Sequence, residues 1–359
     1  MRDLLFDPGM KDWQGPAIWV YNDQVFTESD FENITKINAG TKEFDTQKIG
    51  KFGLGFTSVY HLTDVPSFLS NDSLVIFDPH AEYLGEVLES KDVPGIRINL
   101  SENFKELSNF RHQFEVYNGI FGANFDVANG MFERYDGTLF RLPLRQQEMA
   151  GRSKIKQLEY SNNEVQRLFR KLKDSLSDLI LFTTNITEVE VLEMNHGSVK
   201  KIKSLFKVCK TSLLPGNNSP SIIDVANEEL KRAKENSNYQ PKRKDVVSET
   251  EIKVWHSSQL DSTQRWLTVS SVGSKESFDY ALKNKGYLPC SGVSVPIEQT
   301  HNSQEVFSGR LFCFLHYQSK VICHSTSMRR SLFQVIVKVC KHPLLIIKIM
   351  GKYPAGMIL

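Results

Sequence analysis

The chain has 359 residues, of which 40% are hydrophobic and 24% are charged, a composition typical of a soluble globular protein with room for two domains. Its 44 Lys and Arg residues nearly balance 42 Asp and Glu residues, so the formal net charge of +2 gives no support to a general nucleic-acid or membrane-surface binder. No stretch has the apolar character of a signal peptide or a spanning helix. We therefore expect neither a membrane nor a nucleic acid as a partner.

The five cysteines lie far apart and form no Cys-x-x-Cys pair. That spacing fits neither a disulfide framework nor a structural zinc site, so it favours a reducing compartment, and we expect a cytoplasmic protein. The nine histidines include no His-Glu-x-x-His motif, and no serine stands in Gly-x-Ser-x-Gly. The sequence thus predicts no metal site and gives no motif for a serine hydrolase.

The start of the chain predicts a strand, a short helix, a loop and a second helix. Residues 17–21 form an apolar, β-branched and aromatic run that ends at Asn-Asp, which is typical of a buried strand followed by a turn. Thr27 then begins a capping pattern, and apolar residues follow at helical spacing. Residues 38–51 are rich in Gly, Thr, Lys and Asp and predict a loop, whereas residues 56–62 predict a helix.

The rest of the chain predicts a mixed sheet with helices on one face, because short apolar runs alternate with polar segments. Strands are predicted at 74–77, 96–100, 138–142, 188–192, 199–208, 266–272 and 309–315. Between residues 165 and 181 apolar side chains recur at helical spacing with Arg and Lys between them, which predicts an amphipathic helix. The expected fold class is α/β.

These elements divide the chain into two α/β regions and a tail. Residues 1–150 are expected to form the first domain, and residues 151–315 the second region. A polar stretch at about 214–249 is expected to be a surface insert, partly disordered, because it is crowded with Asn, Ser, Lys and Glu. Residues 316–359 are expected to be a divergent C-terminal tail.

One motif carries chemistry. The segment Ile49-Gly-Lys-Phe-Gly-Leu-Gly-Phe56 contains Gly50-x-x-Gly53-x-Gly55 directly before a predicted helix. Glycines let the backbone approach a phosphate, and the unpaired amides at a helix start point at it. The spacing matches neither the dinucleotide fingerprint nor the P-loop. On the residues alone, phosphate binding and a glycine-rich helix start without a ligand stand as equal alternatives.

Together with Gly40-Thr-Lys42 ahead of it and Ser58-Val-Tyr60 behind it, this box resembles the ATP lid and second glycine box of the gyrase, histidine-kinase and MutL superfamily, which includes the heat-shock ATPases. Five stretches in order resemble more narrowly the repeat module of the sacsin family. They are 15–23, Phe26-Thr27, Tyr60-His-Leu-Thr-Asp-Val-Pro66, Phe77-Asp-Pro-His80 and Asp136-Gly-Thr-Leu-Phe-Arg-Leu-Pro-Leu-Arg145. The resemblance implies a two-layer α/β sandwich of the Bergerat type with ATP or ADP as its ligand.

The same resemblance implies a set of binding residues. Either Asn22 or Asp23 would read the adenine amino group, and Thr138 would lie near the adenine. The lid and glycine box would line the triphosphate through Gly40, Thr41, Lys42, Gly50, Lys51, Phe52, Gly53, Leu54, Gly55 and Phe56. Without the resemblance, Asn22 and Asp23 read as a strand-end turn and Thr138 as a β-branched strand residue. Arg141 and Arg145 are predicted to be surface residues of the same strand.

The catalytic motif of the superfamily is a helix with Glu-x-x-x-Asn, whose glutamate activates water and whose asparagine holds magnesium. No such pattern precedes the first predicted strand, and Glu159 to Asn163 has the spacing only after the Thr138 strand, which we treat as coincidence. Without these groups phosphoryl transfer loses its positioning and electrostatic stabilisation. We assign no catalytic residue and no metal ligand, and expect Mg²⁺ to bind only weakly.

The resemblance therefore implies an ATP- or ADP-binding module of a chaperone or co-chaperone in protein folding and quality control, with impaired hydrolysis. Its partners would be client proteins or heat-shock co-chaperones. The alternative is a non-catalytic protein-interaction scaffold that binds nucleotide weakly or not at all, and the missing Glu-x-x-x-Asn helix favours this alternative for the chain.

Overall fold

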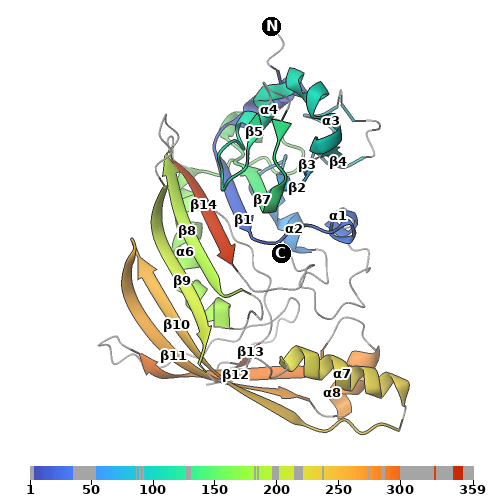
Figure 1. Cartoon of the computed structure of the whole chain (residues 1–359), viewed down its shortest axis with the longest axis vertical. Coiled ribbons are helices and arrows are strands. Elements are labelled where there is room, and N and C mark those ends of the chain that lie inside the picture. The colour runs from blue at the N-terminus through green and yellow to red at the C-terminus, as the bar shows by residue number, and fades with distance from the viewer. Residues whose placement is uncertain are drawn as a thin grey trace.

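The computed structural model describes residues 4–34, 54–85, 87–88, 90, 93–126, 131–181, 183, 186–195, 202–213, 221–236, 238–273, 275–283, 288–299, 327–328 and 343–350. Within these residues the chain is a mixed α/β protein, as the sequence predicts. Its strands form one large sheet in the order β13-β12-β11-β10-β9-β8-β14-β1-β7-β2-β3-β4 (Figure 1).

The strands of this sheet are β1 (Ala17–Asn22), β2 (Ser67–Asn71), β3 (Ser73–Phe77), β4 (Gly95–Asn99), β7 (Tyr135–Pro143), β8 (Glu188–Asn195), β9 (Ile202–Ser212), β10 (Lys244–His256), β11 (Gln259–Val272), β12 (Cys290–Gln299), β13 (Ser327–Met328) and β14 (Pro343–Met350). A separate two-stranded sheet pairs β5 (Phe125–Asp126) with β6 (Met131–Phe132).

The α-helices are α1 (Glu28–Ile34), α2 (Leu54–Thr57), α3 (Leu100–Leu107), α4 (Arg111–Glu115), α5 (Gln147–Ala150), α6 (Asn162–Leu181), α7 (Ile222–Glu235) and α8 (Lys275–Lys283). Three 3-10 helices are η1 (Pro8–Gln14), η2 (Ser58–His61) and η3 (Ser108–Phe110). Helix α1 follows Thr27, whose backbone amide donates to the Asp30 carboxylate at 3.0 Å, which is one half of the predicted capping pattern.

Strand β14 joins the two parts of the sheet. It pairs in parallel with β1 and antiparallel with β8, and it is drawn in red between those strands in Figure 1. The sequence analysis assigned these residues to the C-terminal tail without predicting a strand, and in the structure they form an inner strand of the sheet. Strand partners that are hundreds of residues apart leave no local signal, so sequence pattern cannot predict this pairing.

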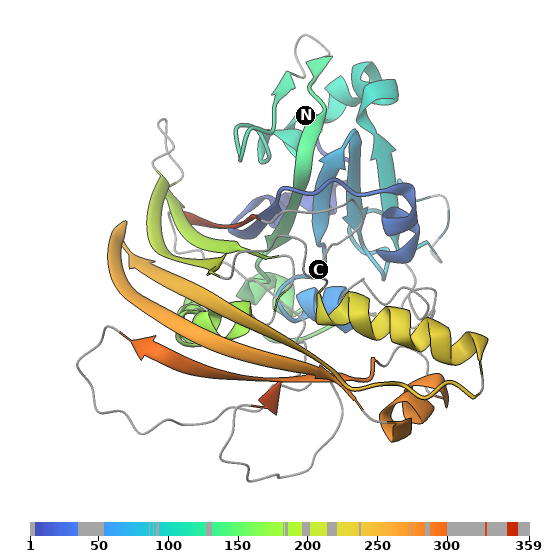
Figure 2. The ribbon, with the colours of Figure 1, turned by 60° about the horizontal axis from the view of Figure 1, so that its bottom comes forward.

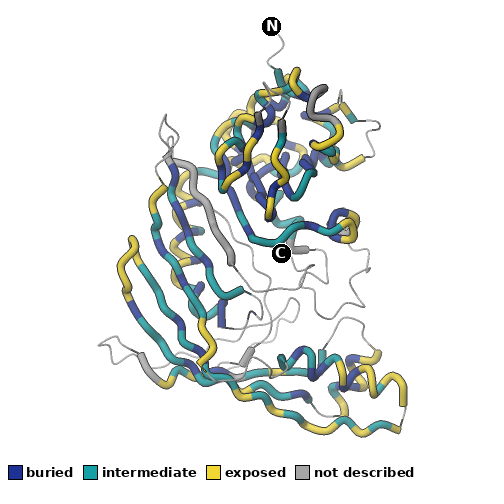
Figure 3. Tube along the Cα trace, viewed as in Figure 1, coloured by how far each residue is buried: buried dark blue, intermediate teal, exposed yellow. Residues whose placement is uncertain are grey.

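Alternation along β1 and β7 separates two hydrophobic cores. Val20 and Phe140 belong to one core, and Trp19 and Leu139 belong to the other. We call the face of Val20 and Phe140 the first face and the opposite one the second face. Helices α1, α2 and α6 pack on the first face, whereas η1, α3 and α4 contribute side chains to the core of the second face. Helices therefore cover both faces of this part of the sheet, where the sequence analysis expected one, and Figure 3 shows its central strands buried.

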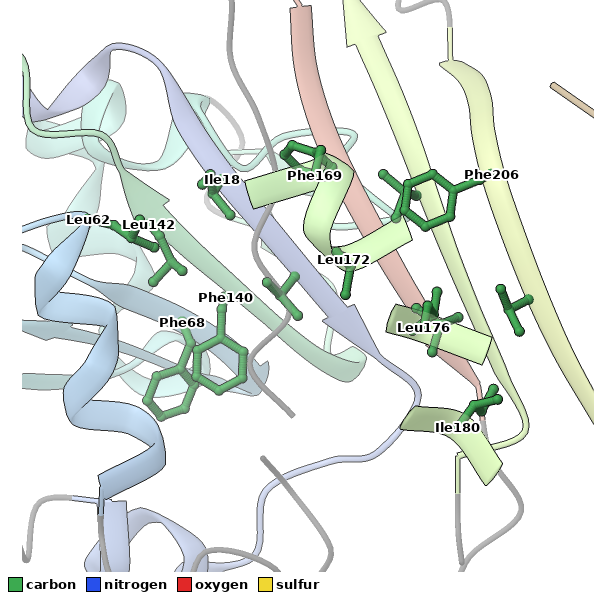
Figure 4. Close-up of a cluster of buried hydrophobic side chains, with 14 of the residues drawn as sticks. Ile18, Leu62, Phe68, Phe140, Leu142, Phe169, Leu172, Leu176, Ile180 and Phe206 are labelled. Atoms are coloured by element: carbon green, nitrogen blue, oxygen red, sulfur yellow. The ribbon is translucent and has the colours of Figure 1, made fainter. Parts of the chain in front are cut away.

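Helix α6 packs across the junction between the two parts. Its buried side chains are Val165, Phe169, Leu172, Leu176, Ile180 and Leu181, which confirms the amphipathic helix predicted from the spacing. They share one core with Ile18 of β1 and Phe206 of β9 (Figure 4). The first region and the second region are thus built on a common core.

The predicted polar insert contains regular structure. Helix α7 begins at a capping box in which Ser221 and Asp224 bond each other's backbone amides, and its apolar face packs against Val272 in a small third core. Its Glu229 is fully buried and pairs with Lys244 of β10 at 2.8 Å. Figure 2 shows α7 beside the strands of this part of the sheet. Composition alone did not predict this helix, because the Lys and Glu residues on its exposed side make the segment look like a polar loop.

We predict that Leu176→Ala lowers the free energy of unfolding by about 2–5 kcal/mol, because Leu176 is fully buried at the junction and its truncation leaves a cavity. Urea unfolding followed by circular dichroism measures this change. Lys173→Ala on the exposed side of the same helix is the control and should change stability by less than about 0.5 kcal/mol. Equal effects of the two variants would contradict the packing of α6.

Candidate functional site

The predicted nucleotide-binding residues fall into three groups. The larger group lies outside the residues that the structure describes and comprises Gly40, Thr41, Lys42, Gly50, Lys51, Phe52 and Gly53. Leu54, Gly55 and Phe56 belong to α2, which begins at Leu54. The remaining residues lie at one end of the β1–β7 pair.

The structure brings Asn22 and Thr138 together. The two residues are direct partners in the antiparallel register of β1 and β7, and alternation places both on the first face, where α2 packs. Gly137, just before Thr138, has a φ of 138°. A Cβ at this position would lie 2.8 Å from the Asn22 carbonyl oxygen and 2.8 Å from the Tyr21 ring. Glycine is therefore required at position 137, because only glycine lets the backbone of β7 approach β1 closely enough to pair Asn22 with Thr138.

Thr138 and Ser70, its partner in β2, hold the turn that follows β1. The Thr138 hydroxyl donates to the Gln24 carbonyl oxygen at 2.6 Å and lies 2.9 Å from Ser70 Oγ. Ser70 Oγ accepts a hydrogen bond from the Phe26 amide at 2.9 Å. Both residues are fully buried. The sequence analysis missed Ser70, since a lone strand serine belongs to no motif.

The turn places Asn22 and Asp23 differently. Asn22 Oδ1 accepts a hydrogen bond from the Gln24 amide at 3.0 Å, which is the strand-end turn predicted from the residues alone. Within the described part of the chain, the side-chain nitrogen of Asn22, Nδ2, makes no hydrogen bond. The pKa of Tyr21 is raised by burial and then by the charges of Asp23 and Asp136. Of the two candidates, Asn22 shares the face of Thr138.

Aromatic packing sets the position of the helix that follows the glycine box. The Phe56 ring lies 4.9 Å from Phe77 and 6.3 Å from Phe140, centroid to centroid. The cluster continues through Phe68, 5.1 Å from Phe140, to Phe26 in the turn after β1, 4.7 Å from Phe68. Because one cluster contacts both α2 and this turn, it fixes the glycine-box helix relative to the Asn22–Thr138 pair.

The 3-10 helix η2, which directly follows α2, is anchored at its end by Arg145. Its Nε donates to Asp64 Oδ1 at 2.7 Å, and its Nη2 donates to the same oxygen. The guanidinium also donates to the carbonyl oxygens of Tyr60 at 2.9 Å and His61 at 3.3 Å. Carbonyls at a helix C-terminus have no partner within the helix, so Arg145 both neutralises Asp64 and caps η2.

The prediction that Arg141 and Arg145 are surface residues is wrong. Arg141 is 3% exposed and Arg145 is fully buried. The ion-pair partner of Arg145 lies 81 residues away in the sequence, and nothing in a single sequence joins the two. A charged residue in a strand was therefore assigned to the surface by default.

Helix α1 is fastened to the sheet edge by Arg97 of β4. The Arg97 guanidinium bonds both carboxylate oxygens of Glu28 at 2.7 Å and lies 3.8 Å over the Phe31 ring. The Arg97 and Glu28 side chains are 40% and 75% exposed, so solvent screens the ion pair, and the stacking on Phe31 adds to the attachment of the helix. This clamp positions the helix that precedes the predicted lid.

The described residues contain no group of three or more His, Cys, Asp or Glu side chains arranged to hold a metal ion. Glu159 and Asn163, which have the spacing of the superfamily motif, are both exposed near the start of α6. Across the described ranges, no helix is long and apolar enough to cross a membrane.

We predict that Arg145→Met lowers the free energy of unfolding by about 3–5 kcal/mol, because it leaves the buried Asp64 carboxylate without a partner. The double variant Asp64→Asn with Arg145→Met should recover part of this loss, since it removes both charges. Arg152→Met is the control: its ion pair with Asp12 is exposed, and its loss should change stability by less than about 1 kcal/mol. Urea unfolding tests these values, and a loss for Arg145→Met as small as that for the control would contradict the anchor.

Comparisons with known proteins match the part of the chain that contains this site. A family model for the Sacsin domain matches residues 1–206, which includes the Asn22–Thr138 pair and all of α6. Human sacsin is 37% identical over 186 residues, covering 52% of this chain. The chain spans 4% of the length of that relative.

Proposed function

This chain belongs to the sacsin domain family, and we propose that its first 150 residues bind ATP or ADP on the first face of the sheet, in a site of the Bergerat type. One observation carries the proposal. Asn22 and Thr138 are direct strand partners on the face where Phe56, at the end of the glycine box, packs. This shared face supports the proposal that the Asn22–Thr138 pair and the glycine box belong to one site.

Asn22 has the chemistry to recognise adenine. Its amide nitrogen offers two donors, and its Oδ1, which accepts one bond from Gln24, keeps a second lone pair. Adenine presents an amino donor next to a ring-nitrogen acceptor, and a carboxamide pairs with both at once. Guanine presents a carbonyl oxygen where adenine has its amino group, so the same pairing is lost. The Thr138 hydroxyl, already bonded to Gln24, acts by holding the turn.

The glycine box would bind the phosphates. Gly50, Gly53 and Gly55 allow close backbone approach, and the amide of Phe56 lies in the first turn of α2. Lys42 and Lys51 would add positive charge. Most of these residues lie outside the described ranges, so their part of the proposal rests on the sequence.

We propose binding rather than turnover as the activity of this site. A carboxamide and a hydroxyl bonded to a backbone carbonyl are not bases for in-line attack on a γ-phosphate. Magnesium would be held mainly by the nucleotide phosphates. In the parent protein, binding would regulate contacts with client proteins or heat-shock co-chaperones in protein quality control, a role that rests on the family and on the resemblance to heat-shock ATPases.

Calorimetric titration with ADP and with ATP plus magnesium tests the proposal. We expect saturable binding of both nucleotides and no phosphate release. Gly53→Val should abolish binding because a side chain blocks the backbone approach, whereas Gly151→Ala, where a Cβ has 3.9 Å of clearance, should leave it unchanged. Asn22→Ala should weaken ADP binding about 10-fold and remove the preference over GDP, since it deletes a bidentate pair of about 1–3 kcal/mol.

Two outcomes would contradict this function. A correctly folded chain that binds neither nucleotide would leave the protein-interaction scaffold as the better account. Phosphate release that survives Gly53→Val would place catalysis elsewhere in the chain.

A further inference from the structure

A second arginine is buried on the face opposite the proposed nucleotide site. Arg141 lies in β7 and is the strand partner of Trp19 in β1 and of Ser67 in β2. Tyr117 covers this row: its ring lies 5.1 Å from Trp19, and its hydroxyl lies 2.5 Å from Ser67 Oγ. Tyr117 is 1% exposed and Arg141 is 3% exposed.

The Arg141 guanidinium has far fewer partners than donors. A guanidinium carries five N–H donors, yet among the described residues the Arg141 guanidinium has a single hydrogen-bond acceptor, the Gly15 carbonyl oxygen, which lies 3.2 Å from Nη2. Its Nε is buried without a partner, and so is Nε1 of the neighbouring Trp19. The guanidinium carbon lies 5.7 Å from the Trp19 ring centroid.

Among the described residues the charge of Arg141 also lacks a counter-charge. No carboxylate of this part of the chain forms an ion pair with it, and the described titratable group that acts on it electrostatically is the neutral Tyr117 phenol. Burial lowers the pKa of Arg141 to about 10, so the group is still charged at neutral pH. Buried Arg145, in contrast, has the carboxylate of Asp64.

A buried cation without a counter-charge is strongly destabilising unless it loses its proton or gains an anion. Arginine does not lose its proton at neutral pH. A water molecule supplies hydrogen bonds but no negative charge. The chemistry that satisfies both the charge and the unpaired donors is an anion.

We propose that Arg141, with Trp19 beside it, binds a small inorganic anion on the second face of the sheet. The low exposure of Arg141 and Tyr117 selects a compact species such as chloride or a sulfate-sized oxyanion. Because the site lies on the face opposite Asn22 and Thr138, this proposal does not depend on whether the chain binds a nucleotide.

Thermal unfolding of the full chain in sodium gluconate, with chloride or sulfate substituted at constant ionic strength, tests this inference. For the wild type we expect a saturable rise in Tm with at least one of these two anions, on the order of 5 °C at a hundredfold excess over Kd. A general salting-out effect of sulfate does not saturate, so the shape of the curve separates the two.

Two variants assign the response to this site. Arg141→Met should remove the saturable response and should be at least as stable as the wild type in gluconate, because it deletes an uncompensated charge at similar volume. Arg97→Met, which removes an exposed arginine that already has a carboxylate partner, should keep the response.

An unchanged wild-type Tm in all three anions would overturn the proposal, whatever the variants do. The proposal also fails if Arg141→Met keeps the saturable response. Should Arg141→Met not fold, Trp19→Phe tests the second donor, and it should shift the midpoint of the anion titration to about 10-fold higher concentration. A midpoint unchanged in Trp19→Phe would remove Trp19 from the site.

Discussion

The register between β1 and β7 is the constraint on which the rest of the structure depends. Asn22 opposite Thr138 and Trp19 opposite Arg141 belong to the same antiparallel ladder. Because side chains alternate along a strand, a slip of one residue would move every apolar side chain of β1 to the other core and separate these pairs. Gly137 is the point at which this register is set, since a side chain there would collide with the backbone of β1. One register thus places the Asn22–Thr138 pair on the first face and the Trp19–Arg141 pair on the second face.

The local elements could be predicted because their signals are local. The apolar run of β1, the short helix after Thr27 and the stripe of α6 each have their signals within a short stretch of chain, and the structure confirms all three elements. The glycine box could be recognised as a motif, but most of it lies outside the described residues, so its role stays a prediction. Long-range features could not be predicted. The position of β14 depends on strands that lie about 150 residues or more away in the chain.

Arg141 in β7 and Arg145 just after it show why charge alone misleads a sequence-based prediction of burial. Both stand in a pattern that looks like a solvated strand edge, yet both are buried. Within the described residues, Arg145 has the Asp64 carboxylate and two backbone carbonyl oxygens as partners, whereas the Arg141 guanidinium has one carbonyl oxygen. Buried charged groups are rare without partners. The fold therefore explains Arg145, and the anion that we propose would supply the counter-charge of Arg141.

Arg145 also couples the glycine-box helix to the second region through its backbone. Its amide donates to the Leu62 carbonyl oxygen at 2.8 Å, and its carbonyl accepts from the Tyr160 amide at 2.8 Å. Tyr160 lies just ahead of α6, whose buried face packs against strands of both regions. The backbone of buried Arg145 therefore forms hydrogen bonds to the segment after η2 and to the segment before α6. Side chains of η2 and α6 also pack in the same core. Any free energy that a ligand adds at the first face is therefore shared with the second region, because the two cannot unfold independently while that core is intact.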